Sequence, residues 1–149
     1  MLEQAIRMAI NAHQRQVDKA GEAYILHPLR VMLVARDAGL DENGQIAAVL
    51  HDVVEDGDVP ITDIGDSFGP IVAGLVDTLT RRRGEPYQEY IARVIADGAE
   101  ARQIKLIDLM DNLRRIPALH KIDSVMATRL LNKYHIGLRQ LKEAGCLKQ

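Results

Sequence analysis

The sequence predicts an all-α fold, an orthogonal multi-helix bundle forming a single domain over residues 1–149. Apolar residues recur at spacings of three and four along almost the whole chain, which is typical of amphipathic helices. No stretch alternates strictly between apolar and polar residues, so no strand is expected. The chain has one Phe, four Tyr and no Trp, while 47% of its residues are hydrophobic. We therefore expect Leu, Ile, Val and Ala to fill the core between short helices.

Three helices are expected in the N-terminal part, each with an apolar face. Pro28 starts the second helix, because a proline at the first helical position loses no hydrogen bond. A polar cap precedes the third helix, and Gly57 with Pro60 stops it. The expected ranges are 2–13, 27–39 and a third helix running from a cap at 41–43 through Val54, with a polar loop at 18–22.

Four further helices are expected after a short turn near Thr62. Gly98 separates the second of these from the third. Pro117 closes the third and Gly145 closes the last, because both residue types commonly end helices. The expected ranges are 70–80, 87–96, 100–116 and 122–143, with a turn at 81–86.

Charge and composition exclude several classes of protein. The 19 Lys and Arg residues against 21 Asp and Glu give a net charge of −2, which provides no overall field for holding nucleic acid. No apolar run approaches the roughly 18 residues of a membrane span, and Glu3 and Gln4 interrupt any signal-peptide core. Cys146 is the single cysteine, which excludes an internal disulfide and a cysteine-based zinc site. We therefore expect a cytoplasmic protein that binds neither nucleic acid nor membrane.

Polar residues stand where the apolar pattern predicts a core. In the sequence AAVLHDVVED, His51 and Asp52 directly follow an apolar run, and Glu55 and Asp56 come one helical turn later. On a helix His51 lies over Glu55 and Asp52 over Asp56, because positions four apart are neighbours. Carboxylates near a helix C-terminus oppose the helix dipole. Two acids at this place therefore indicate compensation by a cation.

Two other segments carry the same feature. Asp108 lies inside the apolar segment IKLIDLMDNL with Asn112 one turn later, and His27 begins a helix after two apolar residues. Each has an ordinary interpretation when taken alone, His27 as a capped core histidine and Asp108 as a partner of Lys105 or Arg115. Buried carboxylates and imidazoles are costly unless they are paired or coordinated. Three separate segments that each carry one favour a shared site.

Two imidazoles and two carboxylates form a mixed nitrogen and oxygen donor set. Such a set suits Mn²⁺, Fe²⁺ or Zn²⁺ better than Ca²⁺. Four ligands on a six-coordinate ion leave two positions open, and the ion lowers the pKa of its water from 15.7 toward about 7. Glu55 and Asp56 are candidates to orient that water and take its proton. The pattern favours hydrolysis of a phosphate ester, and the chain has no P-loop or Gly-x-Ser-x-Gly motif for another chemistry.

The pattern of His27, His51-Asp52 and Asp108 resembles the metal-binding signature of the HD-domain phosphohydrolases. Longer segments resemble the hydrolase domain of the RelA/SpoT family, above all its small stand-alone members, the small alarmone hydrolases. The resemblance covers about residues 5–116, and the last helices carry no matching motif. The matching segments are DKAGEAYILHP at 18–28, LHDVVED at 50–56, FGPIVAGLVDTLT at 68–80 and IKLIDLMDNLRRI at 104–116.

This resemblance implies a function and a set of site residues. It implies removal of the 3′-pyrophosphate from guanosine tetra- and pentaphosphate (ppGpp and pppGpp), with Glu55 and Asp56 activating a water. The cofactor it implies is Mn²⁺, with other divalent transition metals as alternatives. The implied metal ligands are His27, His51, Asp52 and Asp108. The implied substrate contacts are Lys19, Tyr24, Asn112 beside the sugar, and the basic turn that contains Arg81 and Arg83.

The chain departs from this family in the loop before the second helix. The family has Arg-Lys-Ser-Gly where this chain has Asp18-Lys19-Ala20-Gly21, and the family's Arg helps to hold the guanine base by stacking. Asp18 cannot replace that Arg, and an acid at this place repels a ligand rich in phosphate. Ala23 stands where a Pro is common, and Gly57 where Thr is often found.

Three alternatives remain open. The same chemistry can act on another nucleotide or on a phosphorylated dinucleotide, a hypothesis that Asp18 motivates. The residues can also serve a nucleotide- or metal-sensing module without turnover. A structural metal site is the third alternative, although structural sites are closed by their ligands and this donor set leaves positions open. The sequence gives no oligomeric state, but the last helix is long enough to form an interface.

Overall fold

The computed structural model describes residues 1–146, and within that range it contains eight α-helices. The only extended pairing among these residues is one isolated bridge between Val17 and Ala23, so the predicted all-α fold is confirmed. None of the eight helices combines the length and the apolar character needed to cross a membrane. The helices are α1 (Leu2–Ala12), α2 (Leu26–Asp37), α3 (Glu42–Leu50), α4 (Ile61–Phe68), α5 (Pro70–Leu79), α6 (Tyr87–Asp97), α7 (Ala99–His120) and α8 (Ser124–Cys146).

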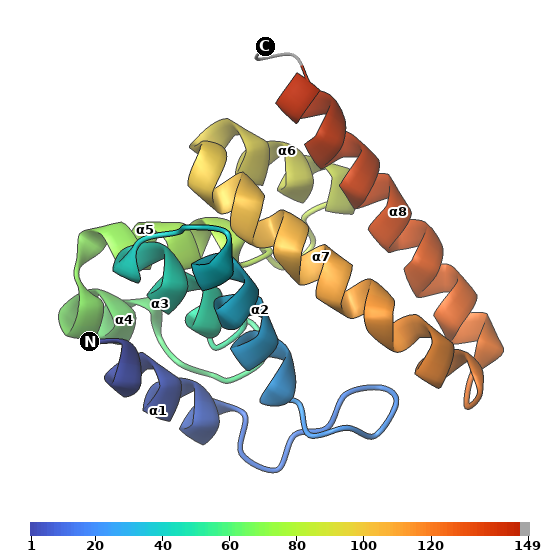
Figure 1. Ribbon diagram of the computed structural model, residues 1–149, viewed down its shortest axis with the longest axis horizontal. Coiled ribbons are helices and arrows are strands. Elements are labelled where there is room, and N and C mark those ends of the chain that lie inside the picture. Colours follow the sequence, from blue (N-terminus) through green and yellow to red (C-terminus); the bar gives the residue numbers. More distant parts are fainter. Residues whose placement is uncertain (147–149) are drawn as a thin grey trace.

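Helix α7 runs through the middle of the molecule and separates two groups of helices (Figure 1). On one side α2 packs against α7 and α3, and α3 in turn contacts α1 and α5. On the other side α8 lies along α7 and α6. The helices cross in several directions, so the chain does not form a parallel up-and-down bundle (Figure 1). Residues from the loop before α2, from the end of α3 and from α7 are thereby brought together.

The C-terminal half of helix α3 is completely buried. Residues 46–50 are each completely inaccessible to solvent, and Val53 just beyond the helix is inaccessible too. This half, Ile-Ala-Ala-Val-Leu, is apolar on all sides, and such a segment belongs in the interior rather than on the surface. The core continues through aliphatic side chains of the other helices, as the sequence predicts. Because α3 is central, the polar residues that follow it are delivered into the interior of the protein.

The third helix ends earlier than the sequence predicts. We expected it to continue through Val54, but α3 ends at Leu50 and residues 51–56 form turns. The Nδ1 atom of His51 donates a hydrogen bond to the carbonyl of Ala48 at 2.7 Å, an oxygen that a longer helix would offer to the amide of Asp52. The amide of Asp56 still bonds the carbonyl of Asp52 at 2.9 Å, so Asp52 and Asp56 remain one turn apart.

Prolines mark helix boundaries differently from the prediction. Pro60 is the N-cap of α4, an eight-residue helix where only a short turn was expected. Pro28 lies at the third rather than the first position of α2, which is still within the first turn where an amide needs no partner. Pro117 does not close α7, which continues to His120 because the burial of Leu119, only 4% exposed, outweighs one missing hydrogen bond.

The last helix also differs from its expected range of 122–143. Helix α8 begins at Ser124, because Asp123 caps it by accepting a hydrogen bond from the amide of Met126 at 2.9 Å. At its other end α8 continues through Gly145, so this glycine does not stop the helix as predicted. Gly145 has no neighbouring atom where a Cβ would lie, and no contact at this position requires the chain to turn.

Candidate functional site

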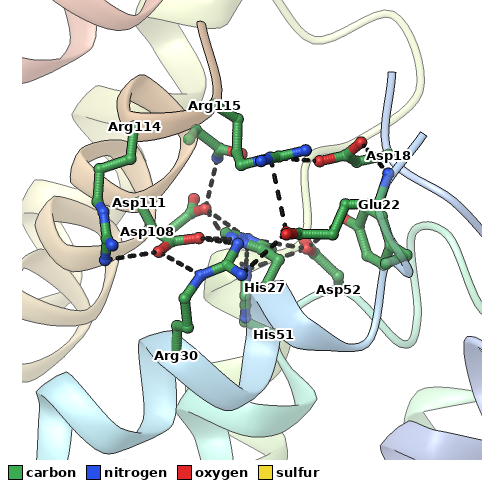
Figure 2. Close-up of polar contacts among 12 residues, drawn as sticks. Asp18, Glu22, His27, Arg30, His51, Asp52, Asp108, Asp111, Arg114 and Arg115 are labelled. Atoms are coloured by element: carbon green, nitrogen blue, oxygen red, sulfur yellow. Dashed lines mark hydrogen bonds and ion pairs between the residues drawn. The ribbon is translucent and has the colours of Figure 1, made fainter. Parts of the chain in front are cut away.

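Four side chains from three segments meet in the interior of the protein (Figure 2). His27 lies in the first turn of α2, His51 and Asp52 directly follow α3, and Asp108 lies in α7. The Nε2 atom of His27 is 3.3 Å from Nε2 of His51 and 3.1 Å from Oδ1 of Asp108. One ligand atom each from His27, His51 and Asp108 lie within 4.8 Å of one another, close enough to hold one metal ion.

Asp52 approaches the same cluster from the side that faces solvent. Its Oδ2 atom is 3.1 Å from Nε2 of His51 and 3.6 Å from Nε2 of His27. The Asp52 side chain is 18% exposed, whereas that of Asp108 is only 4% exposed. The structure therefore brings together all four residues that the sequence predicts as metal ligands.

The tautomers of the two histidines fit a cation between them. The Nδ1 atom of His27 donates to Oδ2 of Asp111 at 2.8 Å, and Nδ1 of His51 donates to the carbonyl of Ala48 at 2.7 Å. With Nδ1 carrying the proton, each neutral ring presents a lone pair at Nε2. Two lone pairs and two carboxylates that face one another in a buried space repel unless positive charge lies between them. The donor set therefore fits a divalent ion.

Asp111 and Arg30 support the cluster from behind, and sequence reasoning missed both. Arg30 holds the Asp111 carboxylate with two hydrogen bonds, from Nε at 2.8 Å and from Nη2 at 3.0 Å. Asp111 in turn orients the ring of His27 through Nδ1. One signal was present, because Asp111 falls on the same apolar segment as Asp108 and is only 6% exposed. Such outer partners orient metal-binding histidines in known sites.

Three further side chains contact the oxygens of the two aspartates. Tyr24 donates from its hydroxyl to Oδ2 of Asp52 at 2.6 Å, and Asn112 donates to Oδ1 of Asp108 at 2.7 Å. Lys105 donates to Oδ2 of Asp108 at 2.6 Å, which is the ordinary pairing considered for Asp108 from the sequence. The other pairing considered, with Arg115, is absent from the described residues, because Arg115 bonds Asp18 instead. Lys105 therefore both neutralises Asp108 and faces the cavity.

The charges of the cluster are strongly coupled. Burial lowers the pKa of His27, but hydrogen bonds to Asp108 and Asp111 outweigh burial and raise that pKa to about 9. Burial also lowers the pKa of His51, while the neighbouring charge of Asp52 and a bond to Asp108 hold it well above its ordinary value. Burial raises the pKa of Asp108, but Lys105 and the two histidines outweigh burial and hold that pKa well below its ordinary value. The cluster thus keeps its carboxylates charged, and without a metal ion the two histidines are protonated, so a bound cation displaces these protons before each Nε2 can donate a lone pair.

Glu55 and Asp56 lie beside the cluster and line the same cavity. Oε2 of Glu55 accepts a hydrogen bond from the amide of Arg81 at 3.2 Å, and Oδ2 of Asp56 lies 3.4 Å from the Tyr24 hydroxyl. Burial, with the nearby charge of Asp52, raises the pKa of both Glu55 and Asp56 above ordinary carboxyl values. A raised pKa suits a group that takes up a proton near neutral pH.

The cluster opens into a cavity of about 610 Å³. This volume falls in the range of small-molecule sites. The cavity is lined mostly by charged and aromatic side chains. They come from the loop before α2, the turn after α3, the turn before α6, and helices α2, α6, α7 and α8. Its cationic lining residues are Lys19, Arg30, Arg81, Lys105, Arg115 and Lys133, and its tyrosines are Tyr24, Tyr87, Tyr90 and Tyr134.

Of the predicted substrate contacts, Lys19, Tyr24, Arg81 and Asn112 line the cavity, whereas Arg83 does not. Arg83 is exposed, and the guanidinium of its neighbour Arg82 is paired with Asp77 at 2.7 Å. The turn directs only Arg81 inward, because the Arg81 guanidinium donates twice to the carbonyl of Glu85. Lys133 and Tyr134 of α8 also line the cavity, although no sequence motif pointed to them.

Comparison with known protein families identifies the class to which this chain belongs. The model of the HD domain family matches residues 5–126, which include all four clustered residues, and the chain is a member of that family. The signature that the sequence resembles is therefore confirmed at the level of the family.

Over the aligned segment, about a third of the residues are identical between the chain and its curated relatives. A guanosine-3′,5′-bis(diphosphate) 3′-pyrophosphohydrolase of Aquifex aeolicus is 35% identical over 122 residues, covering 77% of this chain and 18% of the relative. Another, of Vibrio cholerae, is 33% identical over 129 residues and covers 79% of this chain and 18% of the relative. The chain thus spans less than a fifth of the length of these relatives.

Two solved structures match over most of their own length. One, described as a metazoan ortholog of SpoT that hydrolyzes ppGpp and plays a role in starvation responses, has a TM-score of 0.69 and 27% identity. The match covers 96% of this chain and 92% of that structure. The other, lmo0812 of Listeria monocytogenes, has a TM-score of 0.67 and 30% identity, covering 83% of this chain and 82% of that one.

Proposed function

We propose that this protein is a metal-dependent phosphohydrolase that removes the 3′-pyrophosphate from ppGpp and pppGpp. The observation that carries the proposal is the cluster of two imidazole Nε2 atoms and two carboxylates at the wall of a cavity whose lining includes six cationic side chains beside its carboxylates. The activity after which the relatives and the metazoan structure are named supports the choice of substrate. The reaction consumes ppGpp and water and gives GDP and pyrophosphate.

We propose Mn²⁺ as the metal, held by His27, His51, Asp52 and Asp108. The mixed nitrogen and oxygen donors support Mn²⁺ or a neighbouring transition ion over Ca²⁺. A divalent ion bound there neutralises phosphate charge and lowers the pKa of water toward neutrality. The fixed Nδ1 hydrogen bonds keep both histidines in the tautomer that can donate a lone pair.

The protein's own side chains supply the proton transfer. Asp56 and Glu55, with pKa values raised chiefly by burial, accept the proton of the attacking water. Tyr24 holds Oδ2 of Asp52 and also reaches toward Asp56, so it fixes the two carboxylates relative to each other. Lys19 and Arg81 offer positive charge to the pyrophosphate group, whose negative charge must be balanced inside the cavity.

The substrate is a small nucleotide, and we place the reaction in the cytoplasm. The single Cys146, which cannot form an internal disulfide, is compatible with a reducing compartment. Hydrolysis of another nucleotide or phosphorylated dinucleotide is tested by offering a panel of such compounds to the same preparation. A sensing module is distinguished by thermal stabilisation with ppGpp in the absence of any product.

The proposal is tested by incubating the purified protein with ppGpp and identifying the products by mass spectrometry. We expect GDP and pyrophosphate when Mn²⁺ is added, and neither product when EDTA removes the metal. His51→Ala and Asp52→Ala are expected to abolish turnover, whereas His120→Ala, a change at an exposed histidine away from the cluster, retains it. Intact ppGpp after incubation with the metal-loaded wild-type protein contradicts the proposal.

A further inference from the structure

The loop before α2 is attached to α7 through Asp18, the residue that departs from the family's pattern. Oδ1 of Asp18 accepts hydrogen bonds from the amides of Ala20 and Glu22, both at 2.9 Å. Its Oδ2 accepts a hydrogen bond from Nε of Arg115 at 2.7 Å (Figure 2). One carboxylate therefore fixes the shape of the loop and holds an arginine of α7 at the same time. Asp18 is a paired acid and does not face a ligand alone.

Arg115 is held at one end and free at the other. Its Nε is bound to Asp18, and Oε2 of Glu22 lies 3.6 Å from the same nitrogen. Within residues 1–146 neither terminal Nη group of Arg115 donates a hydrogen bond to protein. The side chain is 30% exposed and lines the cavity. A planar guanidinium is thus presented to whatever occupies the cavity, with its donors unused.

Three cavity-lining residues of α7 follow one another along the helix axis. Asp108, Asn112 and Arg115 are separated by four and then three residues, so they share one face of the helix. At a rise of 1.5 Å per residue, Asn112 lies about 6 Å and Arg115 about 10.5 Å along the axis from Asp108. A nucleotide that binds with its phosphate at the cluster around Asp108 and lies along α7 would pass Asn112 and reach Arg115 at its far end.

From this geometry, and resting on the proposed nucleotide hydrolysis, we infer that Arg115 contacts the base of the substrate and that Asp18 positions it. Guanidinium groups stack on nucleobases and donate to their acceptor edges, and both modes need the plane that Asp18 fixes. The base contact in this chain is then provided by α7 rather than by the loop. Arg115 selects for a ligand that carries a base, whereas the cations near the cluster select for phosphate.

The inference is tested by steady-state kinetics of the Mn²⁺-loaded protein with ppGpp as substrate and pyrophosphate as a competitive inhibitor without a base. We expect Arg115→Met to raise KM for ppGpp about tenfold or more, the size of one lost base contact, with little change in kcat. The inhibition constant of pyrophosphate is expected to stay the same. Arg115→Lys retains the charge but not the plane, and it is expected to raise KM nearly as much.

Two further variants complete the test. Asp18→Asn is expected to raise KM in the same direction but less, because the guanidinium remains while its anchor weakens. Arg36→Met is the matched control: Arg36 is an exposed arginine paired with Asp37 at 3.0 Å outside the cavity, and its loss is expected to change neither constant. Circular dichroism of each variant excludes loss of fold as the cause of a raised KM.

An unchanged KM in folded Arg115→Met overturns the inference. An equal weakening of pyrophosphate inhibition also overturns it, because Arg115 would then contact phosphate rather than base. A wild-type protein that cleaves no ppGpp contradicts the proposed function instead, so the two failures are distinguishable.

Discussion

At the scale of single residues, the site depends on which nitrogen of each histidine carries the proton. His27 and His51 both use Nδ1 as a donor, to a carboxylate in one case and to a backbone carbonyl in the other. Their Nε2 atoms are thereby directed into the cluster. The partner of His27 is Asp111. Burial raises the pKa of Asp111, but hydrogen bonds to His27 and Arg30 outweigh burial and lower that pKa to about 2. Asp111 is therefore charged at neutral pH and holds the His27 proton at Nδ1.

This arrangement predicts that Asp111→Asn weakens Mn²⁺ binding about 10- to 100-fold, because loss of a charged outer partner loosens the histidine it orients. Isothermal titration calorimetry of wild type and variant measures the effect. Asp77→Asn is a suitable control, since Asp77 pairs with Arg82 at the surface, at 2.7 Å and outside the cavity. Equal affinity in wild type and Asp111→Asn contradicts an orienting role for Asp111.

The fall of kcat at acid pH gives a second prediction at the scale of residues. Burial raises the pKa of Asp56 above its ordinary value of 3.8, and a protonated carboxyl cannot accept a proton. The loss of kcat as pH falls is therefore expected at a higher pH than an unperturbed aspartate gives. Asp56→Asn is expected to lower kcat by about 10²- to 10⁴-fold while Mn²⁺ affinity stays unchanged. A variant that turns over normally excludes Asp56 as the proton acceptor.

At the scale of helices, apolar periodicity predicted where helices form but not always where they end. The end of α3 depends on His51 bonding the Ala48 carbonyl, and the end of α7 depends on the burial of Leu119. Both causes are contacts of the folded chain, which local start and stop signals do not contain. The eight residues of α4 were expected as a short turn because Pro60 was taken to stop the preceding helix instead of starting the next.

Close packing of α8 against α6 and α7 gives a prediction at the scale of helices. A Cβ at Gly137 would lie 2.5 Å from the Tyr87 hydroxyl and 2.9 Å from Cδ1 of the buried Leu109. We expect Gly137→Ala to destabilise the protein by about 1–3 kcal/mol, because this overlap outweighs the higher helix propensity of alanine.

The matched control is Gly74→Ala in α5, where no atom lies within 4 Å of the added Cβ. We expect this change to stabilise the protein by about 0.5–1 kcal/mol through helix propensity alone. Urea unfolding of both variants measures the difference. Stabilisation by both changes contradicts the close contact of α8 with α6 and α7.

At the scale of the whole molecule, the cavity is assembled from segments that lie far apart in the sequence. The four clustered residues could be predicted because each is a polar residue in an apolar run, a local signal. Arg30 and Asp111 are 81 residues apart, and their pairing has no local signal in either segment. The cavity-lining Lys133 and Tyr134 were missed for the same reason, since their helix carries no motif and only its packing on α7 brings them to the cavity.

The net charge of the chain does not show how charges are distributed at the site. The chain as a whole carries −2, yet six cations line one cavity beside a cluster of carboxylates. A nucleotide needs a metal ion and positive charge for its phosphates and a separate contact for its base, and the cavity offers side chains suited to each. The composition alone excluded a broad basic surface but could not reveal that six cations gather around one cavity.

The anomalous X-ray signal of manganese in crystals grown with Mn²⁺ tests the metal centre most directly. We expect one strong peak bonded to Nε2 of His27, Nε2 of His51 and the carboxylates of Asp52 and Asp108, with its remaining positions held by water. The absence of a peak at this cluster contradicts a metal centre. A peak enclosed by six protein ligands leaves no position for water or substrate and contradicts a hydrolytic centre.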